Sequence, residues 1–150
     1  DKSCTHDESI ASKMPNPEHG CDSGDNSLND VFVSNGGVYA AHSEPWKMTA
    51  AISGAHTLGS ASIANSGYDG WWASAEQAGI FNNDYYHGIL MKGWGVEKAV
   101  DGNSAKNQWI RIDGMYGDAH KEMMLDTDMC LAVMGLEDDY VTQTELLAST

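Results

Sequence analysis

Three side chains of this 150-residue sequence could act together chemically: His56, Trp72 and Asp128. A neutral imidazole binds a metal ion through one ring nitrogen and offers an N–H from the other. A buried carboxylate that accepts this N–H fixes the tautomer and makes the ligand more electron-rich. A tryptophan N–H can donate to the same carboxylate, whose charge would stabilise a cation on the indole ring. One aspartate could therefore serve both a metal ligand and a redox-active aromatic side chain, but sequence spacing alone does not bring the three together.

The segment from Pro45 to Ala55 must position the histidine, and its pattern predicts a helix. Pro45 suits a first helical turn, because an N–H group there has no partner within the helix. Ser43 or Glu44 can cap this helix. His56 follows one turn after Ile52 and Ser53, on the same face at the helix end. The helical period is carried by Trp46, Thr49, Ala50, Ile52 and Ser53. Small residues nearby (Gly54, Ala55, Gly59) would let a flat, bulky group approach the backbone.

The remaining elements are expected to be mainly helical, with one small β-hairpin. Residues 1–30 are polar and should form a loop or extended arm, and Leu28–Phe32 is expected to be one short helix. A helix is predicted from Asn83 to Lys92, capped by Asn82 or Asn83 and ended by Gly93. Its apolar face would be Tyr85, Tyr86, Ile89 and Leu90. Strands are predicted at 94–100 and 107–113, and further helices at 125–133 and 138–148.

The charge balance excludes one class of partner. The chain carries 22 acids against 8 bases, a formal net charge of −14. Nucleic acid binding needs clustered Lys and Arg to neutralise phosphate, so we expect no nucleic acid partner. An anionic membrane surface is disfavoured for the same reason. No apolar run approaches the roughly 20 residues of a membrane span, so we expect no membrane partner.

The cysteines and the first residue bear on where the protein resides. The sequence begins with Asp1 and shows no signal peptide, which is typical of a processed mature chain or a fragment. Cys4 and Cys21 could close a local disulfide loop, leaving Cys130 free or paired to another chain. This reading predicts an extracellular or secretory-pathway protein. The alternative is three free thiols in a cytosolic protein.

Five segments together resemble plant-type haem peroxidases. Ser53-Gly-Ala-His-Thr-Leu-Gly59 is similar to the family's proximal-histidine motif. Asn65-Ser-Gly-Tyr-Asp-Gly-Trp-Trp72 resembles the segment that follows it in the branch containing cytochrome c peroxidase and ascorbate peroxidase. Phe81-Asn-Asn-Asp-Tyr-Tyr86, Trp94-Gly-Val-Glu-Lys98 and Met124-Leu-Asp-Thr-Asp128 resemble later segments, in family order. Upstream, Met14-Pro-Asn-Pro17 and Leu28-Asn-Asp-Val-Phe32 look like the family's Leu-Pro loop and the helix before the histidine. Any one of these motifs alone would be weak.

The resemblance implies the proximal, C-terminal half of the haem peroxidase fold, with residues 31–150 as one domain. His56 would bind the iron of haem b, with Asp128 bonded to its other ring nitrogen and Trp72 as a catalytic partner. Residues implied beside the cofactor are Ser53, Thr57 and Pro15. The simpler alternatives are a capped or core histidine for His56, core packing for Trp72 and a helix-start role for Asp128.

Departures from the family pattern leave two functions open. The family's distal side uses an Arg and a His three or four residues apart, well before the proximal histidine. Here only 55 residues precede His56, and the single arginine, Arg111, follows it. At two positions where cytochrome c peroxidase has basic residues that help hold a haem propionate, this chain has Ser60 and Ser62. The first possibility is a part of a peroxidase that reduces hydrogen peroxide in the oxidative stress response, with its distal residues in a second chain or fragment. The second is a non-catalytic peroxidase-like subunit of an extracellular assembly. A homo-oligomer or larger assembly would fit either.

Overall fold

The computed structural model describes residues 14–19, 26–34, 36–112 and 121–133. Its elements follow in the order η1 (Asn29–Val33), α2 (Pro45–Ser53), η2 (Gly54–Thr57), β1 (Ser60–Ala61), α3 (Ile63–Ser66), β2 (Gly70–Trp71), α4 (Asp84–Met91), β3 (Trp94–Lys98), η3 (Val100–Gly102), β4 (Asn107–Arg111), β5 (Met123–Met124) and α5 (Asp126–Val133). The predicted helices at 45–55, 83–92 and 125–133 are confirmed. The predicted helix at 138–148 lies outside the described residues.

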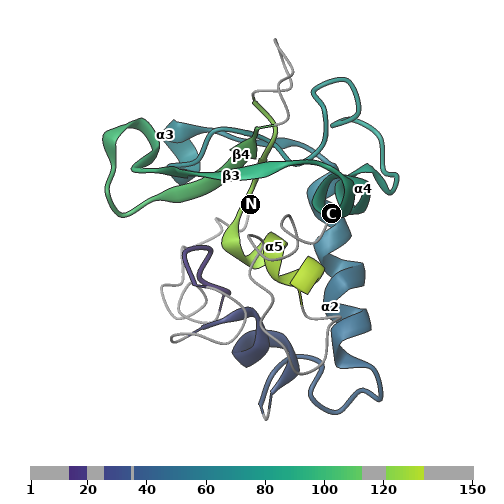
Figure 1. The fold of residues 1–150 in the computed structure, drawn as a ribbon. Coiled ribbons are helices and arrows are strands. Elements are labelled where there is room, and N and C mark those ends of the chain that lie inside the picture. The colour runs from purple at the N-terminus through teal and green to yellow at the C-terminus, as the bar shows by residue number, and fades with distance from the viewer. Residues whose placement is uncertain (1–13, 20–25, 35, 113–120, 134–150) are drawn as a thin grey trace, which may run out of the picture.

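A small antiparallel sheet is formed by β3, β4 and β5 in that order. The predicted hairpin is confirmed, since Trp94 pairs with Arg111 and Lys98 with Asn107. The sequence did not reveal β5, in which Met124 pairs with Trp109. In Figure 1 the hairpin extends beyond α5, with α4 at one end of the sheet and α2 running away from it.

Two close backbone approaches explain where glycine is needed. Gly70 has φ +139°, and a Cβ there would lie 2.1 Å from the Lys121 carbonyl oxygen. Strand β2 can therefore run against Glu122, with which Trp71 forms a bridge. At the end of α2, a Cβ on Gly54 would lie 2.6 Å from the Tyr86 hydroxyl. Glycine thus lets α2 approach α4 closely enough for Tyr86 to donate to the Ala50 carbonyl.

The core consists of two clusters that share one tryptophan. The first contains Tyr85, Ile89, Trp94, Met124 and Met129; the second contains Tyr68, Met123 and Leu125. Trp72 packs against both. The predicted apolar face of α4 is therefore confirmed except at one position. Tyr85 and Ile89 are buried and Tyr86 packs against the first cluster, but Leu90 is 69% exposed.

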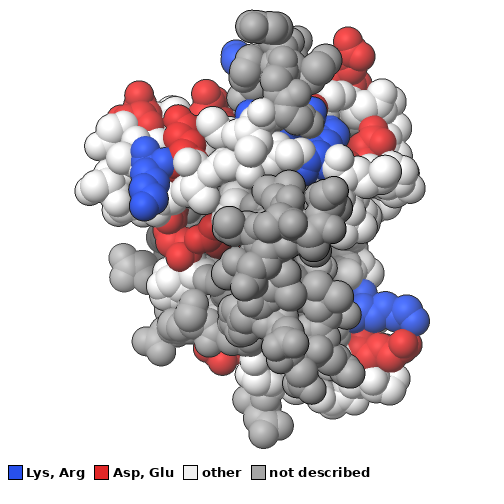
Figure 2. Space-filling model, viewed as in Figure 1, with Lys and Arg blue, Asp and Glu red and all other residues white. Residues whose placement is uncertain are grey.

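Charged groups in the interior are paired. Glu122 is 3% exposed, and its Oε2 accepts from Lys92 Nζ at 2.6 Å and from Arg111 Nη1 at 2.9 Å. Outside the core, acidic and basic side chains are scattered over the face in Figure 2 rather than gathered in one patch. Among the described residues, no helix is both long and apolar enough to cross a bilayer.

Cys130 corrects one expectation. The residue is buried and disulfide-bonded within the chain, so the prediction that it is free or paired to another chain is wrong. The expected Cys4–Cys21 pairing concerns residues outside the described part. Neighbouring cysteines in sequence favour a local loop, but tertiary packing, which spacing cannot show, decides which thiols meet.

Candidate functional site

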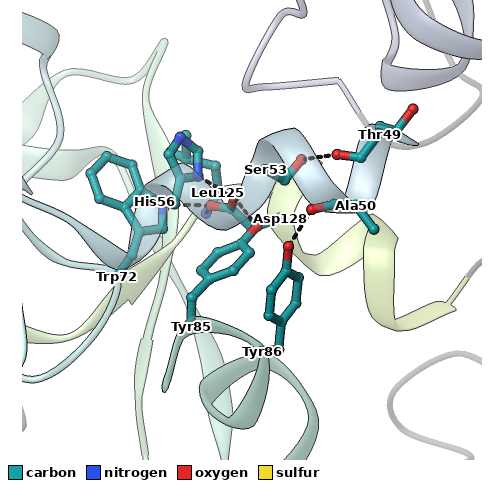
Figure 3. A network of polar contacts seen from close by, with 9 residues as sticks. All are labelled: Thr49, Ala50, Ser53, His56, Trp72, Tyr85, Tyr86, Leu125 and Asp128. Atoms are coloured by element: carbon teal, nitrogen blue, oxygen red, sulfur yellow. Dashed lines mark hydrogen bonds and ion pairs between the residues drawn. The ribbon is translucent and has the colours of Figure 1, made fainter. Parts of the chain in front are cut away.

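Four segments far apart in sequence meet around the carboxylate of Asp128 (Figure 3). His56 lies in η2, the tight turn that continues α2, and Trp72 follows β2 directly. Tyr85 is the second residue of α4, and Asp128 is the third residue of α5. The predicted trio of His56, Trp72 and Asp128 is therefore brought together in space.

Asp128 is 2% exposed and accepts four hydrogen bonds. Its Oδ1 accepts from His56 Nδ1 and from the Tyr85 hydroxyl, both at 2.7 Å. Its Oδ2 accepts from Trp72 Nε1 at 2.7 Å and from the backbone N–H of Leu125 at 2.8 Å. A carboxylate offers about four lone-pair positions, so this set of donors uses its whole capacity.

Asp128 makes the contacts of both roles considered for it, the helix-start role and the bond to His56. An acid at the third helical position that reaches back to the N–H preceding the helix is half of a capping box. Asp128 therefore starts α5 and also holds His56 and Trp72. Negative charge in the first turn, from Asp126 and Asp128, also suits the positive end of the helix dipole.

The aromatic rings fix the orientation of the imidazole. His56 stacks on Trp72, with ring centroids 4.3 Å apart and planes 23° apart. Tyr85 meets the same imidazole edge-on, with centroids 5.7 Å apart and planes at 84°. Because Asp128 accepts from Nδ1, the proton is assigned to that nitrogen and Nε2 keeps its lone pair. No hydrogen bond to Nε2 is found among the described residues.

Tyr85 was missed as a site residue by the sequence reasoning, which placed it only on the apolar face of α4. Its side chain is completely buried. Burial first, and then the charge and hydrogen bond of Asp128, raise the pKa of the Tyr85 phenol well above its ordinary value. The phenol therefore remains a hydrogen-bond donor. The available signal was its chemistry, since a buried tyrosine hydroxyl needs a polar partner.

A pocket of about 340 Å³ opens beside His56 and Trp72. The His56 side chain is 38% exposed, whereas its carboxylate partner is not. The other lining residues are small, polar or apolar, and none carries a positive charge: Pro17, Ser60, Ala61, Ser62, Asn65, Ser66, Tyr68 and Leu125. The imidazole is thus anchored from behind and accessible from the pocket.

Three residues expected beside a cofactor do not line this pocket. The Ser53 hydroxyl turns back along its helix and donates to the Thr49 carbonyl at 2.9 Å. Thr57 is fully buried, and its hydroxyl donates to the Asn82 carbonyl at 3.1 Å. For Pro15, the neighbouring Pro17 is the proline at the pocket wall.

Comparison with known proteins gives a consistent picture over part of the chain. No protein-family profile matches it. A protein named putative heme-binding peroxidase from Pyricularia oryzae is 41% identical over 81 residues, 54% of this chain and 25% of that protein. Mitochondrial cytochrome c peroxidase from Candida glabrata is 36% identical over 81 residues, 54% of this chain and 19% of that protein. A second putative heme-binding peroxidase, from Gibberella zeae, is 36% identical over 92 residues, 61% of this chain and 26% of its own length.

Over about half of its length, this chain is similar to haem peroxidases. The matched part spans only about a quarter or less of the length of these haem peroxidase relatives. The resemblance first seen in the motifs is thereby confirmed, whereas the activity of a whole peroxidase is a separate matter.

Proposed function

We propose that this chain binds haem through His56 Nε2 and forms part of a peroxidase that reduces hydrogen peroxide and oxidises a donor. The observation that carries the proposal is the imidazole itself. Its Nδ1 is held by a buried carboxylate at 2.7 Å, while the ring faces a pocket. This is the arrangement of a metal-binding histidine with a carboxylate behind it. The names of the relatives, heme-binding peroxidase and cytochrome c peroxidase, support the same cofactor.

The donor set fits a single axial ligand. Among the described residues, no group of three or more His, Cys, Asp or Glu side chains could hold a free metal ion. A haem needs only one axial histidine from this side, because the porphyrin supplies the other ligands. Pro17, Ala61 and Leu125 give the pocket wall apolar surface for a flat ring. None of the described lining residues is a cysteine, so we infer haem b, held without covalent attachment.

Bound haem would supply the two-electron reduction of peroxide. The residues of this chain would tune the iron and relay an oxidising equivalent. Asp128, by accepting the hydrogen bond from Nδ1–H, would make the imidazole a stronger donor and so would stabilise oxidised iron. The same carboxylate, 2.7 Å from Trp72 Nε1, stabilises positive charge on that indole. Trp72 is therefore assigned as the site that stores or relays one oxidising equivalent.

The distal acid and base belong outside the described part of this chain. Arg111, the single arginine in the sequence, is held by the buried Glu122 at 2.9 Å and does not line the pocket. We therefore propose a second chain or fragment that covers the open side of the pocket and supplies these groups. For location, the disulfide bond of Cys130 supports the secretory pathway, whereas the word mitochondrial in the names of two relatives does not.

One observation favours a second candidate, a non-catalytic peroxidase-like subunit of an extracellular assembly. The described part of the pocket wall carries Ser60 and Ser62 and no cation, so the carboxylates of a haem would find hydroxyl groups there rather than charged partners. In a chain of net charge −14, this weakens retention of an anionic cofactor.

Titration of the full chain with hemin separates the two candidates. We expect a Soret band that shifts on adding cyanide, and its loss in His56→Ala. The matched control is His42→Ala, an exposed histidine outside the pocket, which should bind haem like the wild type. Equal haem retention in His56→Ala would refute the ligand assignment, and a colourless wild-type protein would support the structural subunit.

A further inference from the structure

A second buried phenol stands in the wall of the same pocket. Tyr68 lies between α3 and β2 and is 4% exposed. It packs with Met123 and Leu125 in the cluster against which Trp72 also rests. Tyr68 and Trp72 both line the pocket beside His56. The phenol thus shares one apolar cluster and one pocket with the oxidisable indole.

The Tyr68 hydroxyl has a proton acceptor of its own. It donates to Glu18 Oε1 at 2.5 Å. Glu18 is held in turn by the backbone N–H of Asn107 at 3.0 and 3.1 Å and by Asn107 Nδ2 at 2.9 Å. Burial, followed by the hydrogen bond and charge of Glu18, raises the pKa of the Tyr68 phenol. The proton therefore stays on Tyr68 as long as the ring is not oxidised.

Oxidation reverses this preference, because removing one electron from a phenol makes its proton strongly acidic. We propose that Tyr68 is a second oxidisable residue of this site, and that Glu18 accepts its proton. The Oη–H bond of Tyr68 breaks and an O–H bond forms on Glu18 Oε1, leaving a neutral phenoxyl radical. The electron passes to the peroxide-oxidised centre of the proposed function, by way of Trp72 where that residue is present and directly where it is replaced. This inference rests on the proposed function, in which peroxide is the terminal oxidant.

The surrounding charges set the order of oxidation. Lys106 Nζ lies 4.6 Å from the centre of the Tyr68 ring and 3.4 Å from its hydroxyl. This cation disfavours loss of negative charge from the Tyr68–Glu18 pair, whereas Asp128 favours positive charge on Trp72. Trp72 is therefore oxidised first, and Tyr68 becomes the main radical site when Trp72 is absent or already used.

The first test uses haem-loaded protein and the variant Trp72→Phe. After addition of hydrogen peroxide and freeze-quenching, we expect an electron paramagnetic resonance signal that narrows with ring-deuterated tyrosine. Adding Tyr68→Phe should remove most of this signal, while adding Tyr39→Phe, which changes a tyrosine stacked on Phe32 and not in the pocket lining, should retain it. An unchanged signal in Trp72→Phe/Tyr68→Phe, or its loss in Trp72→Phe/Tyr85→Phe instead, would overturn the proposal.

The second test needs no haem, so it separates failure of this inference from failure of the proposed function. The full chain is oxidised by a photogenerated one-electron oxidant, and radicals are located by spin trapping and peptide mass spectrometry. We expect the adduct on Tyr68 to fall several-fold in Glu18→Gln, because an amide cannot take the proton, and to rise in Lys106→Met. A wild-type yield in both variants would refute the role of Glu18, even if the chain never binds haem.

Discussion

Replacing Tyr85 or its neighbour Tyr86 by Phe tests the Asp128 network with two almost identical changes. Each substitution deletes one hydroxyl from α4. The Tyr85 hydroxyl donates to a buried carboxylate at 2.7 Å, whereas the Tyr86 hydroxyl donates to the neutral backbone carbonyl of Ala50. Tyr85 is fully buried, so water cannot replace its bond, while Tyr86 is half-buried.

The expected losses follow from these partners. A hydrogen bond to a charged group contributes about 1.5–3 kcal/mol, and a neutral one about 0.5–1.5 kcal/mol. Asp128 is not left unsatisfied in Tyr85→Phe, since His56 still donates to the same oxygen. Tyr85→Phe should therefore cost about 2 kcal/mol, and Tyr86→Phe about 1 kcal/mol or less, because the Ala50 carbonyl keeps its bond from the Gly54 N–H.

Urea unfolding followed by tryptophan fluorescence measures both losses, provided that the slope with denaturant is unchanged. The cycle is completed in an Asp128→Asn background, where the hydroxyl can only meet a neutral partner. There the loss from Tyr85→Phe should shrink to about 0.5–1.5 kcal/mol, and that from Tyr86→Phe should stay the same. Equal losses for the two tyrosines in the wild-type background, or no change of the Tyr85 loss with Asp128→Asn, would refute the reasoning.

Three further changes probe other parts of the structure. Burial raises the pKa of Asp126 above its ordinary 3.8. The contribution of Asp126 to the free energy of unfolding is therefore complete below pH 3.8, and it is lost as the pH rises through the pKa of the folded state. Asp126→Asn should therefore stabilise the fold near pH 7 but not near pH 3, as measured by urea unfolding at each pH. Gly70→Ala should cost about 4 kcal/mol or more by thermal unfolding, because its Cβ would meet a carbonyl oxygen at 2.1 Å. Gly79→Ala, with open space around it, should change stability by less than about 0.5 kcal/mol. Ser62→Lys should tighten haem binding about fivefold in a hemin titration, which corresponds to roughly 1 kcal/mol. The same charge added by Ser104→Lys, on an exposed turn away from the pocket, should have little effect.

Local pattern was enough to place the longer helices and the hairpin, but not the short strands, and it was less reliable for which face an element buries. Pro45 starts α2 as predicted, and Asn83 is the N-cap of α4. Ile52, expected on the helical face that carries His56, is 51% exposed, whereas Thr49 is buried and satisfies its hydroxyl by donating to the Pro45 carbonyl. Residue polarity therefore does not predict which face of this helix is buried, because a threonine can be buried when its hydroxyl bonds to a carbonyl of its own helix.

The assembly of the site was beyond pattern reasoning. Asp128 lies 72 residues after His56 and 56 after Trp72, so no helical or strand period relates them. Resemblance to a family supplied the trio. It did not supply Tyr85, because periodicity treats a tyrosine as an apolar position, and the bond that distinguishes it depends on how α4 packs against α5.

The filled coordination of Asp128 ties the proposed chemistry to the fold. Four donors occupy its four lone-pair positions, and one of them is the N–H that precedes α5. Water has no position left from which to screen the carboxylate, so its charge acts on the imidazole and the indole in a low-dielectric setting. The hydroxyl of Tyr85 shares Oδ1 with His56 and draws charge away from that bond. Tyr85 therefore limits how electron-rich His56 can become. If haem is bound as proposed, Tyr85→Phe should make the iron's reduction potential more negative, whereas Tyr86→Phe, which leaves Asp128 untouched, should not. A structural role for Tyr85 alone would alter stability without moving the potential.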